Sequence, residues 1–152
     1  MAFEAIRKLT DRVAKLDEGI ILNRFVELPI VQKFILDLNR VDQLFNKGVD
    51  SKNRALGVYT PFTINSKNER GVPVPSDFHI TLFDTGEFYS TFVIIPGKDF
   101  FEIDANPIRE DTNLFEDFGE DILGLNDENL QILIDFFKET VVLRVKEQLR
   151  LL

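Results

Sequence analysis

The sequence contains no cysteine and no tryptophan, and it has a single histidine, His79. Without cysteine, the chain forms neither a disulfide nor a thiolate metal site. The lone histidine lies in a predicted strand, which leaves nucleophilic catalysis of the Ser-His type without a supporting base arrangement. The glycine patterns of P-loop and dinucleotide-binding proteins are missing, because Gly71, Gly86 and Gly97 are isolated turn glycines. Packing therefore relies on the 15 phenylalanines and on aliphatic residues.

Long apolar runs and an excess of positive charge are missing as well. No run approaches the roughly 20 apolar residues that cross a bilayer. Charged residues interrupt positions 3–16, so we expect no secretory signal and a soluble protein without membrane contact. The formal charge is −8. Because affinity for nucleic acid comes mainly from lysine and arginine, we expect no direct, sequence-specific nucleic-acid binding.

The chain has 152 residues, of which 44% are hydrophobic, and this suits a single domain with its own core. We divide it into an N-terminal helical arm, residues 1–28, and an α+β core, residues 29–152. The arm begins with a predicted helix over 3–18, and residues 20–28 fit either a continuing helix or an extended segment. A narrow apolar stripe in the first helix consists of Ile6, Leu9, Val13 and Leu16. Such a stripe favours packing on one neighbouring helix, in the same subunit or in another.

Two longer helices are predicted in the core. Pro29 suits the first turn of a helix over 29–45. Its predicted core face consists of Ile30, Phe34, Leu38, Val41 and Phe45, joined by Val31, Ile35 and Leu44. A C-terminal helix opens at Asn126, and its apolar residues exceed one stripe. We expect this helix to be covered from two sides, by the sheet and the 29–45 helix or by a second subunit. Val142 and Leu143 are our interface candidates there.

Between these helices the sequence predicts strands. Alternation indicates a strand over 78–84, and apolar runs indicate strands over 91–95 and 100–104. Because the connections are short, we expect antiparallel pairing in a meander, with 59–64 as a further edge strand. The predicted fold is therefore α+β: a small antiparallel meander of three or four strands, packed with N-terminal helices and a long C-terminal helix.

A polar loop over 67–77 is the predicted mobile segment, and it contains two further interface candidates, Arg70 and Val72.

Two turns are expected to hold this fold. In the first, Asp84 and Thr85 supply side-chain oxygens to backbone amides, and Gly86 permits the bend into a short helical turn. Glu87 follows Asp84 by three positions, as in a capping box. In the second turn, a short helix over 113–118 ends at Phe118 and Gly119, with its N-terminus capped by Asp111 or Thr112.

The same two turns carry a resemblance to a known family. Residues 84–92 run Asp-Thr-Gly-Glu-Phe-Tyr-Ser-Thr-Phe, and residues 114–119 run Leu-Phe-Glu-Asp-Phe-Gly. The first segment resembles the Asp-Thr-Gly-x-Leu-x-x-Ser-Ile segment of the tail-completion, or head-tail joining, minor capsid proteins of long-tailed bacteriophages. The second is similar to that family's Tyr-Ala-x-x-x-Glu-Phe-Gly segment. The order of predicted elements matches over residues 30–150, whereas Thr91-Phe92 stands in place of Ser-Ile and Asp117 in place of Glu.

This resemblance implies a non-enzymatic virion protein without a cofactor. It would form a homo-oligomeric ring at the neck, where it would contact portal, adaptor or tail proteins after assembly in the bacterial cytoplasm. Two alternatives stay open. Asp84-Thr85-Gly86 is also the triplet of aspartic proteases, which with one triplet per chain must dimerise to pair two carboxylates. The third possibility is a soluble adaptor that binds one partner.

Acidic residues lie on both sides of the second turn in the sequence: Asp111, Glu116, Asp117, Glu120 and Asp121. It lacks the ordered oxygen spacing of a calcium loop. We therefore predict no metal site and interpret the cluster as a solvated face or an intersubunit charge patch.

Overall fold

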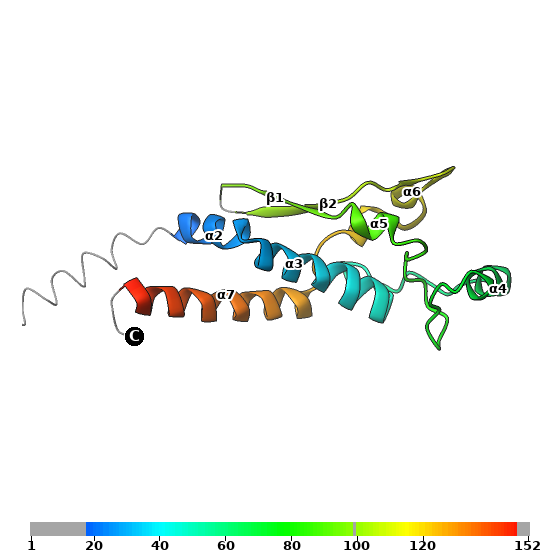
Figure 1. Ribbon diagram of the computed structural model, residues 1–152, viewed down its shortest axis with the longest axis horizontal. Helices are drawn as coiled ribbons and strands as arrows, with labels where there is room; N and C mark the ends of the chain where they lie inside the picture. The colour runs from blue at the N-terminus through cyan, green and yellow to red at the C-terminus, as the bar shows by residue number, and fades with distance from the viewer. Residues whose placement is uncertain (1–17, 99, 149–152) are drawn as a thin grey trace, which may run out of the picture.

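The computed structural model describes residues 18–98 and 100–148 of the chain. The four residues of the predicted N-terminal stripe, Ile6, Leu9, Val13 and Leu16, lie outside the described residues. The α+β prediction is confirmed, because helices, two small antiparallel sheets and a long C-terminal helix make up the described chain. Figure 1 shows an elongated molecule in which the hairpin of β1 and β2 lies on one side of helices α2 and α3, and α7 lies on the other.

The middle layer consists of α2 (Glu18–Glu27), α3 (Pro29–Asp37) and the π-helix η1 (Leu38–Lys47). Pro29 occupies the first turn of α3, as predicted. The predicted core face is only partly right, because Ile30 is 74% exposed and Val41 is 43% exposed. After Leu38 the backbone winds more widely than an α-helix, so Val41 no longer shares a face with the α-helical positions before it.

The four strands form two separate sheets. Strands β1 (Val93–Pro96) and β2 (Phe101–Asp104) pair antiparallel, and both correspond to predicted strands. Strands β3 (Ile108–Arg109) and β4 (Thr112–Asn113) form a second, two-residue ladder. The expected single meander is therefore divided into two hairpins.

The predicted strand over 78–84 is wrong. This stretch makes one isolated bridge, between Val58 and His79. Phe78 and Leu82 have φ angles of 61° and 56°, in the left-handed region. Such residues interrupt the alternation of side chains across a pleated strand, which the apolar pattern had led us to expect.

The predicted edge strand over 59–64 is also wrong, because helix α4 (Pro61–Glu69) begins there. The Thr60 hydroxyl accepts a hydrogen bond from the Thr63 amide at 3.3 Å and so caps this helix. Pro61 is the first helical residue, a position at which its missing N–H costs nothing. We call residues 58–79 the α4 arm, since they leave and return to the body at the Val58–His79 bridge.

The remaining helices are α5 (Glu87–Ser90), α6 (Leu114–Phe118), the 3-10 turn η2 (Glu120–Ile122) and α7 (Asp127–Gln148). The short helix α6 is confirmed, but its predicted cap is wrong. Asn113, rather than Asp111 or Thr112, accepts from the Phe115 amide at 3.0 Å, since β4 extends through Thr112 to Asn113. Asn126 caps α7 by accepting from the Asn129 amide at 2.9 Å.

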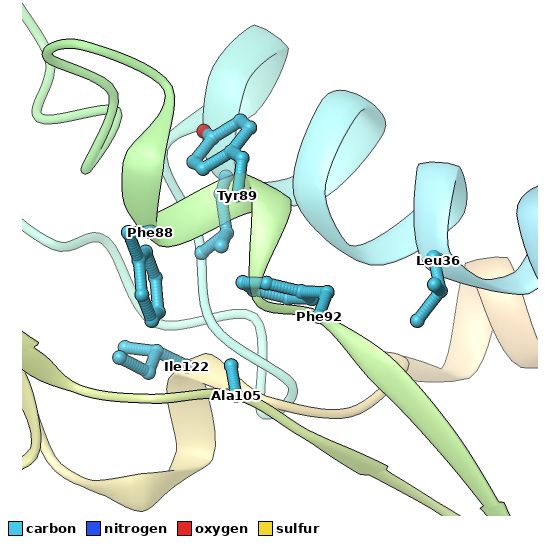
Figure 2. Packing of buried hydrophobic residues seen from close by; sticks show 7 residues of the cluster. Leu36, Phe88, Tyr89, Phe92, Ala105 and Ile122 are labelled. Atoms are coloured by element: carbon cyan, nitrogen blue, oxygen red, sulfur yellow. The ribbon is translucent and has the colours of Figure 1, made fainter.

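Two hydrophobic clusters stabilise these elements. The first surrounds α5, and Figure 2 shows Phe88 beside Ile122, with the Phe92 ring on the side of Phe88; the centres of the Phe88 and Phe92 rings are 5.0 Å apart. The second lies between the middle layer and α7, where the Phe25 ring is 4.9 Å from that of Phe137. Ile94 and Ile103 of the β1–β2 hairpin pack against both clusters. The inner face of the hairpin therefore joins the two halves of the core.

Four buried amide side chains connect η1 to the start of α7, and we call them the amide clasp: Asn39, Gln43, Asn126 and Asn129. Asn39 donates to the Ile122 carbonyl at 3.0 Å and accepts from the Gly124 amide at 2.8 Å. Gln43 donates to the Gly124 carbonyl at 2.9 Å and accepts from the Asn126 amide at 2.8 Å. These bonds supply partners for backbone groups of the 122–126 segment.

Among the residues that the structure describes, helix α7 is covered on one side only. Leu133 is 5% exposed, and Asn129 donates to the Leu38 carbonyl at 3.0 Å, so this side faces the middle layer. The sheet lies on the far side of that layer and does not cover α7 (Figure 1). Of the two predicted alternatives, cover of α7 by the sheet and the 29–45 helix of one subunit is therefore wrong, and cover by a second subunit stays a prediction. Apolar side chains that remain 37–54% exposed on α7 are Leu130, Ile132, Ile134, Val142 and Leu143.

Candidate functional site

The bend at Asp84 is tied to the α4 arm by its carboxylate. Arg70 donates from Nη1 and Nη2 to the two carboxylate oxygens, at 2.9 and 2.8 Å. Lys67 Nζ donates to the Phe83 carbonyl at 2.6 Å and lies 3.3 Å from Asp84 Oδ1. A two-point arginine–carboxylate pair is geometrically specific as well as charge-assisted. It fixes the direction in which the arm leaves the body.

The predicted capping box at this bend is wrong. The residue that precedes α5 is Gly86, and its φ of 85° lies in the left-handed region. The Asp84 carboxylate points to the arm instead, and Thr85 Oγ1 accepts from the Glu87 amide at 3.3 Å. A Cβ added at Gly86 would lie 3.2 Å from the Phe83 ring, so both conformation and space favour glycine.

Charge at the bend follows from these contacts. The hydrogen bonds from Arg70 are the largest cause that lowers the pKa of the Asp84 carboxyl, and partial burial opposes them. The Lys67 side chain is 5% exposed, whereas that of Asp84 is 51% exposed. The buried ammonium also lies 4.9 Å from the centre of the Tyr59 ring. The Asp84 carboxylate is therefore the ion-pair partner of the buried Lys67 ammonium, whose other contacts are the Phe83 carbonyl and the Tyr59 ring.

A hydroxyl network holds the irregular stretch before the bend. The hydroxyls of Tyr59 and Thr81 are 3.0 Å apart, and the Phe83 amide donates to Thr81 Oγ1 at 3.1 Å. Tyr89 donates its hydroxyl to the Thr81 carbonyl. Burial raises the pKa of Tyr89, so the hydroxyl keeps its proton as a donor. Side-chain bonds thus replace the ladder bonds of the strand that we had predicted.

The second predicted turn lies at the end of α6. Gly119 has a φ of 84°, and its amide donates to the Phe115 carbonyl at 2.9 Å. Phe118 packs against the first hydrophobic cluster. Both turns therefore lie around the same core, one at each of the two short helices α5 and α6.

A groove of about 770 Å³ separates the α4 arm from α5, α6 and the β3–β4 turn. Its charged lining residues are Lys67, Arg70, Asp84, Glu87, Arg109, Glu110 and Asp111. Positive and negative side chains alternate there, and Asp84 is already paired with two cations. Proteolysis by an aspartate dyad requires two carboxylates that share a proton, with no cation between them. In one subunit, Asp84 therefore lines the groove as an ion-paired carboxylate.

The other predicted chemical groups are also engaged. His79 Nε2 lies 2.8 Å from the Phe45 carbonyl oxygen, and Nδ1 lies 2.5 Å from Asp77 Oδ1. In the acidic cluster, Asp121 contacts Lys52 at 2.9 Å and Arg54 at 2.6 Å. Over residues 18–98 and 100–148, no three histidine or carboxylate side chains are grouped to hold a metal ion. In the same ranges, no helix has the length and apolarity needed to cross a membrane.

The interface candidates fall into different environments. Arg70 is committed to Asp84, and Val72 is half-buried in the arm. Val142 and Leu143 are 50% and 54% exposed on α7.

One apolar surface, the outer side of the β1–β2 hairpin, was not predicted from the sequence. Val93 is 49% exposed and Ile95 is 45% exposed there, and Phe100 near the turn is 56% exposed. The alternation of outward apolar residues along 93–95 was a signal for this surface, because it places Ile94 alone toward the core. The amide clasp left no comparable signal in the sequence.

No protein-family model matches the chain, and comparisons with curated proteins and with solved structures found no match.

Proposed function

We propose that this protein is a non-enzymatic structural component of a bacteriophage virion that assembles as a ring at the head-tail junction. The observation that supports assembly is the presence of apolar side chains on two opposite sides of the molecule, α7 and the β1–β2 hairpin. A ring requires heterologous contact, in which one patch of a subunit meets a different patch on the next copy. Opposite placement of the two surfaces suits that geometry.

The chemistry at the bend supports an architectural role. The Asp-Thr-Gly segment that resembles the tail-completion family connects the arm, α5 and the core through Asp84 and Gly86. Its carboxylate is paired with Arg70 and Lys67, an arrangement that holds two segments together. In the proposed neck, portal, adaptor or tail proteins of the same virion are the further partners.

The test is mass measurement of the purified protein by light scattering and native mass spectrometry over a range of concentrations. The protein is measured alone and with the portal, adaptor and tail proteins encoded by the same genome. We expect a closed oligomer of defined copy number and a further mass increase with at least one neck protein. A stable monomer that binds none of them would contradict the proposal.

The same preparations separate the two alternatives. A one-to-one complex with a single partner, without self-association, would favour the adaptor. Peptide cleavage at acid pH that is lost in the Asp84→Asn variant would favour the homodimeric protease, since only a carboxylate shares the catalytic proton.

A further inference from the structure

We propose that the outer face of the β1–β2 hairpin in one copy packs on a defined row of α7 in the next copy. This inference rests on the proposed assembly and names the two surfaces that meet. In each case the binding partner is a second copy of this chain. The supporting observation is that the two surfaces carry opposite charges beside exposed apolar residues.

The hairpin face follows from the register of its strands. Val93 lies opposite Asp104, and Ile95 lies opposite Glu102. Residues directly opposite each other in an antiparallel pair share one face of the sheet. All four of these side chains are exposed, whereas Ile94 packs against the two core clusters. The hairpin face therefore presents two apolar side chains on β1 and two carboxylates on β2.

The α7 row has the opposite charge. Ile134, Lys138, Val142 and Lys146 are spaced by four residues, so they follow one another along one side of the helix. All four are exposed. The α7 row therefore presents two apolar side chains that alternate with two ammonium groups.

The two surfaces also agree in spacing. Successive residues of the α7 row are about 6 Å apart along the helix, and Val93 and Ile95 are about 7 Å apart along the strand, as are Glu102 and Asp104. A helix laid along the hairpin thus places Val142 against the apolar pair, with Lys138 and Lys146 one turn before and after it, on the side of the two carboxylates.

The charged side chains of both surfaces lack ion-pair partners within the described part of one subunit. In the part of the chain that the structure describes, no ion pair includes Glu102, Asp104, Lys138 or Lys146. Asp104 accepts one hydrogen bond, from the adjacent Ala105 amide at 2.9 Å. Exposed Asp135 and Glu139 also lie on α7, and Asp135 accepts from Gln131 at 2.9 Å. Two copies of a chain with net charge −8 repel each other over most of their surfaces. The pairing of hairpin carboxylates with α7 lysines would therefore favour this contact over other contacts between copies.

Figure 1 places the hairpin and α7 on opposite sides of the middle layer, so this contact is heterologous. Each copy would offer its hairpin face to one neighbour and its α7 row to the other. A contact of this type closes into a ring when its rotation divides a full turn.

Charge reversal tests the pairing. The hairpin variant carries Glu102→Lys with Asp104→Lys, and the helix variant carries Lys138→Glu with Lys146→Glu. We expect each variant alone to show only the monomer mass at concentrations where the wild type is oligomeric. An equimolar mixture should regain the oligomer with strictly even copy numbers, because each reversed surface finds its complement only on the other variant.

A matched control carries Glu69→Lys with Glu116→Lys, two exposed carboxylates outside both surfaces. This control changes the net charge as the hairpin variant does and should keep the wild-type oligomer. Far-UV circular dichroism and thermal unfolding of every variant must match the wild type, which separates lost contact from lost folding.

Each other outcome overturns the inference in a recognisable way. Assembly of both variants alone would reject the hairpin–α7 contact while leaving the proposed ring intact. Loss of assembly in the helix variant only, without rescue on mixing, would show that α7 meets a surface other than the hairpin face. A wild type that stays monomeric and binds no neck protein would instead reject the proposed function together with this contact.

Discussion

The amide clasp predicts that Asn39→Leu destabilises the fold strongly although the side chain keeps a similar size. Asn39 is fully buried and serves two backbone groups, the Ile122 carbonyl and the Gly124 amide. Leucine has no polar side-chain atom, so both backbone groups lose their side-chain partner at once. The two backbone groups are then left without hydrogen bonds, because their places in the 122–126 segment are fixed by the rest of the clasp.

The expected loss follows from the number of groups left unpaired. Each buried polar group without a partner costs about 1–3 kcal/mol, so two of them lower the free energy of unfolding by about 2–6 kcal/mol. Since Ile122 is fully buried and Gly124 is only half-buried, the carbonyl should account for the larger part. Domains are typically stable by about 5–15 kcal/mol, so this loss is a large fraction of the total.

The assay is urea unfolding followed by far-UV circular dichroism, at a protein concentration where the chain is monomeric. Asn65→Leu is the matched control, because Asn65 is exposed on α4 and the chemical change is the same. We expect the control to unfold within about 0.5 kcal/mol of the wild type. Equal midpoints for the two variants, with equal slopes, would show that the clasp does not stabilise the joint between η1 and α7.

Three further predictions concern the bends and the ion pairs. Gly86→Val should lower the unfolding midpoint more than the exposed change Asn68→Val, because a φ of 85° strains any β-branched residue; equal midpoints would contradict this. Asp84→Asn should cost about 0.5–1 kcal/mol at neutral pH. The pKa of the Asp84 carboxyl is lowered, so its ion pairs stabilise the fold above the ordinary pKa of 3.8. That stabilisation is lost as the pH falls through the lowered pKa, and unfolding curves of wild type and variant should converge there; a constant difference down to strong acid would refute it. Arg54→Met should lower the free energy of unfolding in urea, because it leaves the buried Asp50 carboxylate with backbone donors only; an unchanged free energy would contradict this.

The sequence predicted those elements whose signals are local. Pro29 marked the start of α3, Asn126 marked the start of α7, and the apolar runs on either side of Pro96 and Gly97 marked the β1–β2 hairpin. In each case the deciding residues are neighbours along the chain, and their preferences agree with the packing.

Distant contacts decided the elements that were predicted wrongly. The stretch 78–84 alternates like a strand, yet Thr81 is bonded to Tyr59 and Tyr89, which lie far from it in sequence or on another element. Helix α4 is an exception, because its deciding contact is local. Pro61 fits an edge strand or a first helical turn equally well, and the cap from Thr60 to the Thr63 amide selects the helix.

The candidate surfaces show the same division. The apolar excess of α7 was visible in the sequence, whereas the exposed side of the hairpin required the register of β1 on β2. The pairing of Asp84 with Arg70 and Lys67 was also invisible, since α4 itself was predicted as a strand and a loop. Sequence patterns identify which residues are apolar, and only the fold shows which of them remain uncovered.

The α4 arm offers a practical handle on the assembled particle. Gly71 lies just after α4, and nothing stands within 4 Å of a side chain added there. The arm projects from the end of the molecule away from the β1–β2 hairpin (Figure 1). A short peptide epitope inserted at Gly71 would therefore stay clear of the proposed hairpin–α7 contact, and electron microscopy of antibody-labelled particles would then count and orient the subunits.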